Sequence, residues 1–215
     1  MPAVAVKFSD YQKHPKPKRV YCDSNFAISL LNWERLKTKQ HLLPPADRAC
    51  YSFCQLLLND GVEIVASLFT YQEVLHFYCF QFQGGMYDVA ANFLRSKGVT
   101  VPPSPHKQFK ELVKNYKTDA EALWKTISYR VEATDELFVQ YGIRLLAPLP
   151  SPELTNITKH VADFASILKY EFVEVEATDA LHVSLATYLA SDAIVSRDRG
   201  MLSLDLDGLV IYWTS

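Results

Sequence analysis

The chain has 215 residues, a mass of 24.5 kDa and a formal net charge of −2 at pH 7. Apolar residues make up 49% and charged residues 21%, which is the balance of a globular protein with one sizeable core, not of a disordered or collagen-like chain. The apolar runs fall short of the roughly 20 residues that cross a bilayer, and the first residues lack a signal-peptide pattern. We therefore expect a cytoplasmic protein without a membrane segment.

We treat residues 1–18 as an N-terminal extension and residues 19–215 as one domain in which strands alternate with helices. The expected strands are apolar runs, which in chain order are Arg19–Asp23, Val62–Ser67, IRLLAPLP after Gly142, AIVS (193–196) and LVIYW (209–213). The expected helices are Ala27–Lys37, Ala46–Asn59, Thr70 to about Phe82, Met86–Lys97, one from near Pro105, Asp119 to Tyr141, one opened by Ser151 and Pro152, and Asp179–Ala190 capped by Thr178.

This alternation predicts an α/β fold, in which a mostly parallel central sheet is covered by helices on both faces. Stop signals support the predicted helix ends, since Asn59-Asp60-Gly61 follows the second helix and Gly98 follows the fourth. We expect the middle of the chain, about residues 86–169, to be mainly helical and to form an insertion in the three-layer α/β/α domain.

The four cysteines favour buried free thiols. Cys50 and Cys54 are four apart on a predicted helix, while Cys22 and Cys79 lie in apolar segments. They form no CxxC pair, and no His/Cys spacing suggests a zinc site.

Two short segments are basic although the net charge is close to zero. The two groups are Lys13, Lys16, Lys18 and Arg19, and Lys107, Lys110, Lys114 and Lys117. The second group falls on one helix face, since its spacing is three, four and three. Either group suits contact with a nucleic-acid backbone or serves only as a solubilising surface.

Four acidic residues lie where a predicted strand ends or a helix begins: Asp23, Glu73, Asp179 and Asp198. In an open α/β sheet, ligands bind beyond the carboxyl ends of the strands, near a switch in strand order. Carboxylates gathered there repel one another unless a hard divalent cation holds them. An oxygen-only ligand set matches Mg²⁺ or Mn²⁺ better than zinc.

Each acid also has a structural explanation. Glu73 completes a capping box with Thr70, Asp179 suits the positive end of a helix dipole, and Asp198 suits a turn before Gly200. Asp23 ends an apolar strand and is the hardest of the four to explain in this way.

Three segments carry these acids in the order and surroundings of a known family. They are VYCDSNFAISLL, SLFTYQEVLHF and ATDALHVSLATYLASDAIVSRDRGM. The first looks like the opening strand and helix of PIN-domain nucleases, the second like their second acidic motif, and the third like their third and fourth. The resemblance covers about residues 20–82 and 177–212, and its nearest subgroup is the VapC-type toxins. The middle segment makes this chain longer than those compact toxins.

The resemblance implies a ribonuclease whose four acids bind one or two Mg²⁺ or Mn²⁺ ions and hydrolyse RNA phosphodiester bonds. Asn25 and Ser196 match polar positions that orient ligands or water. Arg197 and Arg199 either contact RNA phosphate or form a solvated turn. For His182 we favour a packed or hydrogen-bonded side chain over a metal ligand.

The family also implies a homodimer and, for toxin members, an antitoxin peptide bound across the acidic pocket. We keep two other function classes beside the endoribonuclease. One is a catalytically inactive PIN-like module that binds RNA or protein, and the other is a metal-dependent phosphatase or DNA nuclease with a similar carboxylate site.

Overall fold

The computed structural model describes residues 4–81, 85–101, 120–146, 176–203 and 208–214. The chain divides into two compact units, one of residues 1–71 with 137–215 and one of residues 72–136. The helices expected near Pro105 and Ser151, the strand end at Pro148 and the lysines at 107–117 lie outside the described residues. Within the described ranges, none of the helices is long and apolar enough to cross a bilayer.

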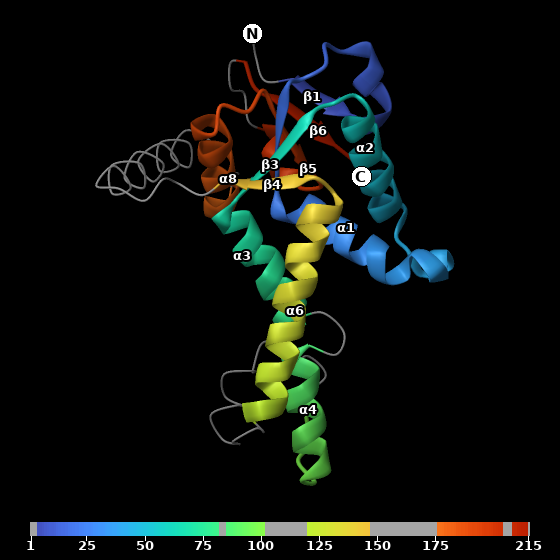
Figure 1. Cartoon of the computed structure of the whole chain (residues 1–215), viewed down its shortest axis with the longest axis vertical. Helices are drawn as coiled ribbons and strands as arrows, with labels where there is room; N and C mark the ends of the chain where they lie inside the picture. The colour runs from blue at the N-terminus through green and yellow to red at the C-terminus, as the bar shows by residue number, and fades with distance from the viewer. Residues whose placement is uncertain (1–3, 82–84, 102–119, 147–175, 204–207, 215) are drawn as a thin grey trace, which may run out of the picture. The chain divides into compact units, whose positions relative to one another are not determined.

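The first unit contains a sheet of six described strands (Figure 1). They are β1 (Val4–Lys7), β2 (Arg19–Cys22), β3 (Glu63–Ser67), β4 (Ile143–Leu146), β5 (Ala193–Ser196) and β6 (Val210–Trp213). Every neighbouring pair is parallel, and the order across the sheet is β1-β6-β5-β2-β3-β4. This confirms the predicted parallel α/β sheet.

Helices cover both faces of the sheet, which makes three layers (Figure 1). On one side lie α1 (Ser24–Leu36) and α2 (Pro45–Asn59), which pack against each other. On the other lies α8 (Ala177–Tyr188), whose Ala180 and Val183 pack on alternate strand residues such as Tyr21. Because successive side chains of a strand point to opposite faces, each strand contributes to both core layers.

The edge strand β1 comes from the segment that we set apart as an N-terminal extension. Val4 of β1 lies opposite Val210 of β6, so residues 4–7 are part of the sheet. The 3₁₀ helix η1 (Phe8–Lys13) follows, and its Tyr11 is buried against Phe53 and Tyr212. Residues 4–13 are therefore part of the first unit and not an extension outside it.

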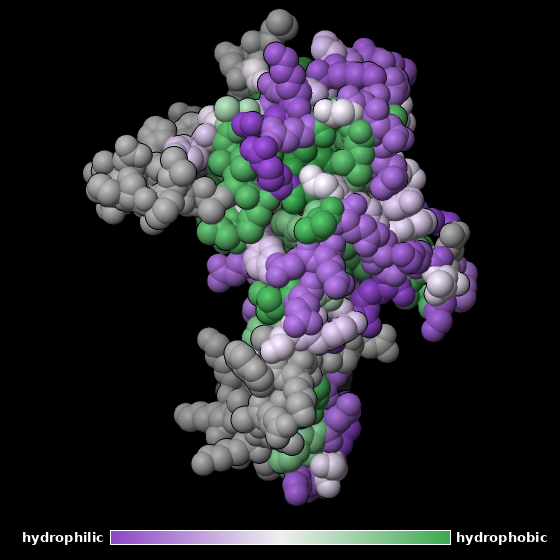
Figure 2. Space-filling model, viewed as in Figure 1, coloured by the Kyte–Doolittle hydropathy of each residue, from purple (hydrophilic) through white to green (hydrophobic). Residues whose placement is uncertain are grey.

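Strand order reverses at the centre of the sheet. From β2 the chain builds β3 and then β4 on one side, and then returns to β5 on the other side of β2. The carboxyl ends of β2 and β5 are thus neighbours at the switch point, where open α/β sheets bind ligands. In the view of Figure 2, hydrophilic side chains cover the surface over η1, and hydrophobic side chains are visible beside α2.

Two predicted caps are wrong. α8 begins at Ala177 with Glu176 at the N-cap, so Thr178 lies inside the helix. α3 (Leu68–His76) begins two residues before Thr70, whose N–H donates to the Ser67 hydroxyl at 3.2 Å. The serine at the end of β3 therefore accepts the first-turn N–H, as an N-cap side chain does.

The described part of the second unit is mainly helical and begins with the last residues of α3. It contains the π-helical turn η3 (Phe77–Gln81), α4 (Met86–Ser96) and most of α6 (Ala120–Gln140). The buried Arg130 of α6 donates to the Tyr78 carbonyl and lies 4.5 Å from the centre of the Tyr78 ring. This cation–π and hydrogen-bond pair connects α6 with the π-helical turn inside the unit.

Candidate active site

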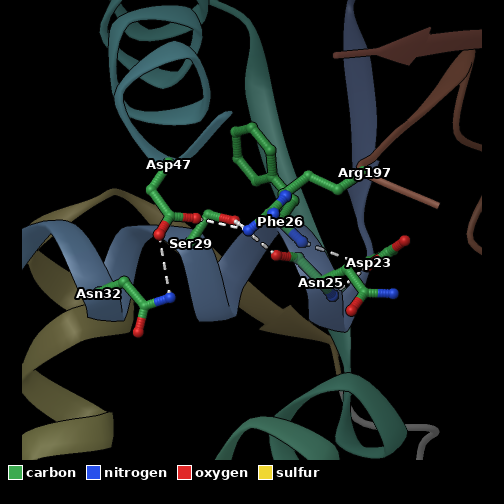
Figure 3. Close-up of polar contacts among 7 residues, drawn as sticks. All are labelled: Asp23, Asn25, Phe26, Ser29, Asn32, Asp47 and Arg197. Carbon is green, nitrogen blue, oxygen red and sulfur yellow. Dashed lines mark hydrogen bonds and ion pairs between the residues drawn. The ribbon is translucent and has the colours of Figure 1, made fainter. Parts of the chain in front are cut away.

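Asp23 is the first residue after β2 and caps α1. Its N–H continues the sheet by donating to the Val195 carbonyl at 3.2 Å. Its Oδ1 accepts the N–H groups of Asn25 and Phe26, and its Oδ2 accepts the Ser196 hydroxyl (Figure 3 shows the α1 cap). The side chain is 1% exposed, and this burial raises the pKa of the carboxyl group, while His182 and the three donors act in the opposite direction.

Ser196 connects the first acid to the last. The same hydroxyl that donates to Asp23 accepts the Asp198 N–H at 2.8 Å. Asp198 Oδ1 in turn accepts the Gly200 N–H at 2.7 Å. The turn after β5 is therefore held by side-chain bonds that begin at the Asp23 carboxylate. Ser196 was expected as the polar residue flanking the last acid, Asp198, and its role in orienting ligands or water stays a prediction.

Asp179 and Asp198 are brought together at Gly200. Asp179 lies in the first turn of α8, and Gly200 begins the 3₁₀ helix η4 (Gly200–Ser203). A Cβ atom added to Gly200 would lie 3.0 Å from Asp179 Oδ2 and 3.2 Å from Asp198 Oδ1. Both oxygens therefore border the space where a side chain would stand, and glycine keeps that space free.

The three acids form a group of like charge. Burial, then the charge of Asp198, then that of Asp23, raise the pKa of Asp179 to about 6. This is the response expected of a carboxyl group beside other carboxylates. A divalent cation would relieve the repulsion, and carboxylate oxygens are the donors that Mg²⁺ and Mn²⁺ prefer. By charge and donor type, Asp23, Asp179 and Asp198 fit such a cation.

The group is not a closed metal site as it stands. In the part of the chain that the structure describes, no three His, Cys, Asp or Glu side chains lie in an arrangement ready to hold a metal ion. The three acids therefore suit a divalent cation by their oxygen donors and their place in the fold, and not by a preformed coordination geometry.

Glu73, the predicted fourth acid, lies in α3 within the second unit. Its part in the site stays a prediction. The capping-box explanation fails in its predicted form, because that box places Thr70 at the N-cap, whereas Thr70 lies inside α3 and its N–H bonds to Ser67.

A buried polar network around the Tyr21 hydroxyl was not among our predictions. The Tyr21 hydroxyl contacts Ser67 Oγ at 2.9 Å, Thr70 Oγ1 at 2.8 Å and His182 Nδ1 at 3.0 Å. Thr70 Oγ1 also donates to the Cys22 carbonyl at 3.2 Å. His182 is thus a buried, hydrogen-bonded histidine, as we favoured. A tyrosine within an otherwise apolar central strand was the available signal, since a buried hydroxyl needs a partner.

The two arginines beside Asp198 differ. Arg199 is exposed, as either of its predicted roles requires. Arg197 is turned inward, where its Nη1 forms an ion pair of 2.5 Å with Asp47 Oδ1 and donates to Ser29 Oγ at 2.9 Å (Figure 3). The side chain of Asn25 is exposed, and it is its backbone N–H that contacts Asp23.

Asp47 is the residue that sequence reasoning missed. It is completely buried on α2, at the spacing of the apolar positions Cys50, Cys54 and Leu57. An acid in register with the buried face of a helix is a signal, because a buried carboxylate requires a charged or hydrogen-bonding partner. The cysteines themselves are buried and free, in agreement with the prediction.

Comparison with protein-family models and with curated protein sequences finds no match to this chain.

Proposed function

We propose that the chain is a Mg²⁺- or Mn²⁺-dependent endoribonuclease that hydrolyses RNA phosphodiester bonds. One observation carries the proposal: Asp23, Asp179 and Asp198 gather at the switch point of a parallel sheet, where burial first, and then the charges of Asp198 and Asp23, raise the pKa of Asp179 to about 6. Such perturbed groups concentrate at functional sites. The resemblance to PIN-domain nucleases supplies the reaction, and Asp23, Asp179 and Asp198 lie in its motifs.

In this proposal Asp23, Asp179 and Asp198 hold the cation. The bound cation supplies Lewis acidity and neutralises the charge that develops on the phosphate. Ser196 fixes the rotamer of Asp23 through its hydroxyl and positions the backbone of Asp198.

The proposed partners follow from the same resemblance. RNA is the substrate, and the exposed Arg199 is available to a phosphate. A homodimer and an antitoxin bound across the acidic pocket complete the toxin form of the proposal.

A second candidate is a non-catalytic module that binds RNA or protein. The hydrogen bonds of Asp23 favour it, because both of its oxygens are engaged, one as the helix cap and one with Ser196. An N-cap acid of this kind stabilises a helix without any metal.

Cleavage of total cellular RNA with Mn²⁺ separates the two candidates. Asp198→Asn is compared with Asp192→Asn, because both acids flank β5 and the Asp192 side chain accepts the backbone N–H groups of Lys18 and Arg19 at the other end of the strand. We expect Asp198→Asn to lower the rate by at least ~100-fold and Asp192→Asn to cleave normally. Equal cleavage by wild type, Asp23→Asn and Asp198→Asn contradicts the proposed site.

The same protein preparations are then assayed with single-stranded DNA and with a phosphomonoester under identical metal conditions. If the protein turns over single-stranded DNA faster than RNA, the proposed activity becomes that of a DNA nuclease. If it turns over the phosphomonoester faster, the proposed activity becomes that of a phosphatase.

A further inference from the structure

The ion pair between Arg197 and Asp47 joins the turn after β5 to the helical layer beside it. Asp47 is 0% exposed on α2. Its Oδ1 accepts from Arg197 Nη1, and its Oδ2 accepts from Asn32 Nδ2 of α1 at 3.1 Å (Figure 3). An uncompensated carboxylate in such a place is strongly destabilising, so the pair constrains both partners.

Arg197 is also bound to the helix that Asp23 caps. The same Nη1 donates to Ser29 Oγ at 2.9 Å, and the Ser29 hydroxyl donates to the Asn25 carbonyl at 2.8 Å. Arg197 stands between Ser196, which donates to Asp23, and Asp198, the last of the acids. Anchoring the Arg197 side chain therefore restrains the backbone of both neighbours. The turn is thus held from the Asp23 side by Ser196 and from the helix side by Arg197.

These contacts are difficult to combine with an arginine that binds substrate. The Arg197 side chain is 32% exposed and is directed to a completely buried acid. Moving it to an RNA phosphate would leave Asp47 with a buried charge and, among the described residues, the Asn32 amide as its remaining side-chain donor. The cost of an unpaired buried charge opposes that movement.

We infer that Arg197 is a positioning residue whose ion pair with Asp47 sets the place of Asp198 at the carboxylate site. The inference rests on the proposed nuclease function, and it assigns to Arg197 a structural task at that site in place of RNA binding. Asp47, 150 residues earlier in the chain, becomes part of the machinery although it touches neither metal nor substrate.

The deciding variant is Asp47→Asn, which removes the partner charge and leaves Arg197 in place. We expect kcat with Mn²⁺ to fall about 10- to 100-fold, as for other groups that orient a ligand from outside, while KM stays within about 2-fold. Arg197→Gln should show the same loss, and the double variant should lose no more than either single variant. If Arg197 contacts RNA, Asp47→Asn instead retains kcat, and Arg197→Gln raises KM and weakens the salt dependence of binding. That pattern overturns the inference.

Glu63→Gln is the matched control. Glu63 pairs with Arg19 at 2.7 Å and with Arg144 at 2.8 Å, at the amino ends of β2 and β3, on the opposite edge of the sheet. We expect it to lose stability without a change in kcat. Should Asp47→Asn fail to fold, Ser29→Ala removes one of the two Arg197 acceptors, and we expect kcat to fall about 3-fold; an unchanged kcat in Ser29→Ala then counts against the inference.

Hydrogen exchange gives a measurement that needs neither metal nor RNA. The Asp198 and Gly200 amides are bonded to Ser196 Oγ and Asp198 Oδ1. In Asp47→Asn they should exchange about 10-fold faster than in wild type, whereas the Val20 and Tyr21 amides of the central strand should not change. Selective loss of protection with no RNA cleavage by wild type contradicts the nuclease and leaves the positioning role standing. Uniform acceleration across the sheet makes the pair a stability element only and overturns the inference.

Discussion

The acids at the amino ends of the strands (the amino edge of the sheet) have different surroundings from the acids at the carboxyl ends (the carboxyl edge). At the amino edge, Glu63 lies between Arg19 and Arg144, and Asp192 accepts the backbone N–H groups of Lys18 and Arg19 at 2.8 and 3.0 Å. Both acids there face donors. At the carboxyl edge, Asp23, Asp179 and Asp198 are gathered near one another.

The consequence is visible in the ionisation of the acids. Burial raises the pKa of Asp23, and burial with two neighbouring carboxylates raises that of Asp179 to about 6. A fold gains nothing from collecting like charges, so an edge that does so is suited to a ligand that brings the opposite charge. The acids of the amino edge stabilise the fold through their donors, while the repulsion among the acids of the carboxyl edge lowers the stability of the metal-free fold.

The largest expected effect is the response of the carboxyl edge to a cation. Ligand at 100 times its Kd stabilises a protein by about 2.7 kcal/mol, which in a domain of this size raises Tm by about 8 °C. Thermal unfolding with and without Mn²⁺ measures this shift. Asp198→Asn should lose it, and Glu63→Gln at the amino edge should keep it. A Tm that is independent of Mn²⁺ in wild type rules out the metal site.

A smaller loss is expected when the amino edge is broken. Arg19→Met removes the bond to Glu63 and the one from Nη1 to the Leu189 carbonyl at 2.7 Å, while Arg144 still pairs with Glu63. Hydrogen bonds of charged groups contribute about 1.5–3 kcal/mol, so we expect a loss of about 2 kcal/mol in urea unfolding, with RNA cleavage at the wild-type rate per folded molecule. A lower kcat would show that the two edges are coupled.

Removing a charge from the carboxyl edge should stabilise the metal-free protein. Because the pKa of Asp179 is about 6 when folded and 3.8 in its ordinary state, folding favours the protonated acid, and deprotonation costs stability as pH rises through 6. Two pH units correspond to at most about 3 kcal/mol, and solvent screening reduces this to about 1 kcal/mol. Asp179→Asn should therefore raise the unfolding free energy at pH 7, and the gain should fade between pH 6 and 4. A constant gain over this range would exclude ionisation as its cause.

The sequence was sufficient for the parts of this comparison that depend on local pattern. Apolar runs ending in an acid or a serine gave β2, β3 and β5, and therefore the edge at which Asp23 and Asp198 meet. The stop at Asp60-Gly61 was also correct, since Gly61 has φ +69°.

The parts that depend on tertiary pairing were not predicted. β1 has four residues and a single buried side chain, Val6, so no alternation of apolar and polar residues predicted it. It is a strand because it pairs with β6. We predicted that Arg197 contacts RNA phosphate or lies in a solvated turn, because its partner Asp47 is 150 positions away in the sequence. Helix caps failed for a related reason: Thr178 has the chemistry of a cap, but α8 starts at Ala177, so its N-cap is Glu176, two residues before Thr178.

The smallest effect on stability, and the most local, is expected at Gly200, where the carboxyl edge can be filled without removing a charge. A Cβ there would stand 3.0 Å from Asp179 Oδ2 and 3.2 Å from Asp198 Oδ1, closer than such contacts normally come. Gly200→Ala does not require a left-handed backbone, so the metal-free stability should change by no more than about 0.5 kcal/mol. The carboxylates must separate, however, and the Mn²⁺ affinity measured by calorimetry should fall about 10-fold. Gly61→Ala, in which the added Cβ meets no neighbour but the backbone has φ +69°, should do the reverse and lose stability with its Mn²⁺ affinity intact. If both alanines affect stability and affinity alike, the space between the two carboxylates has no special role.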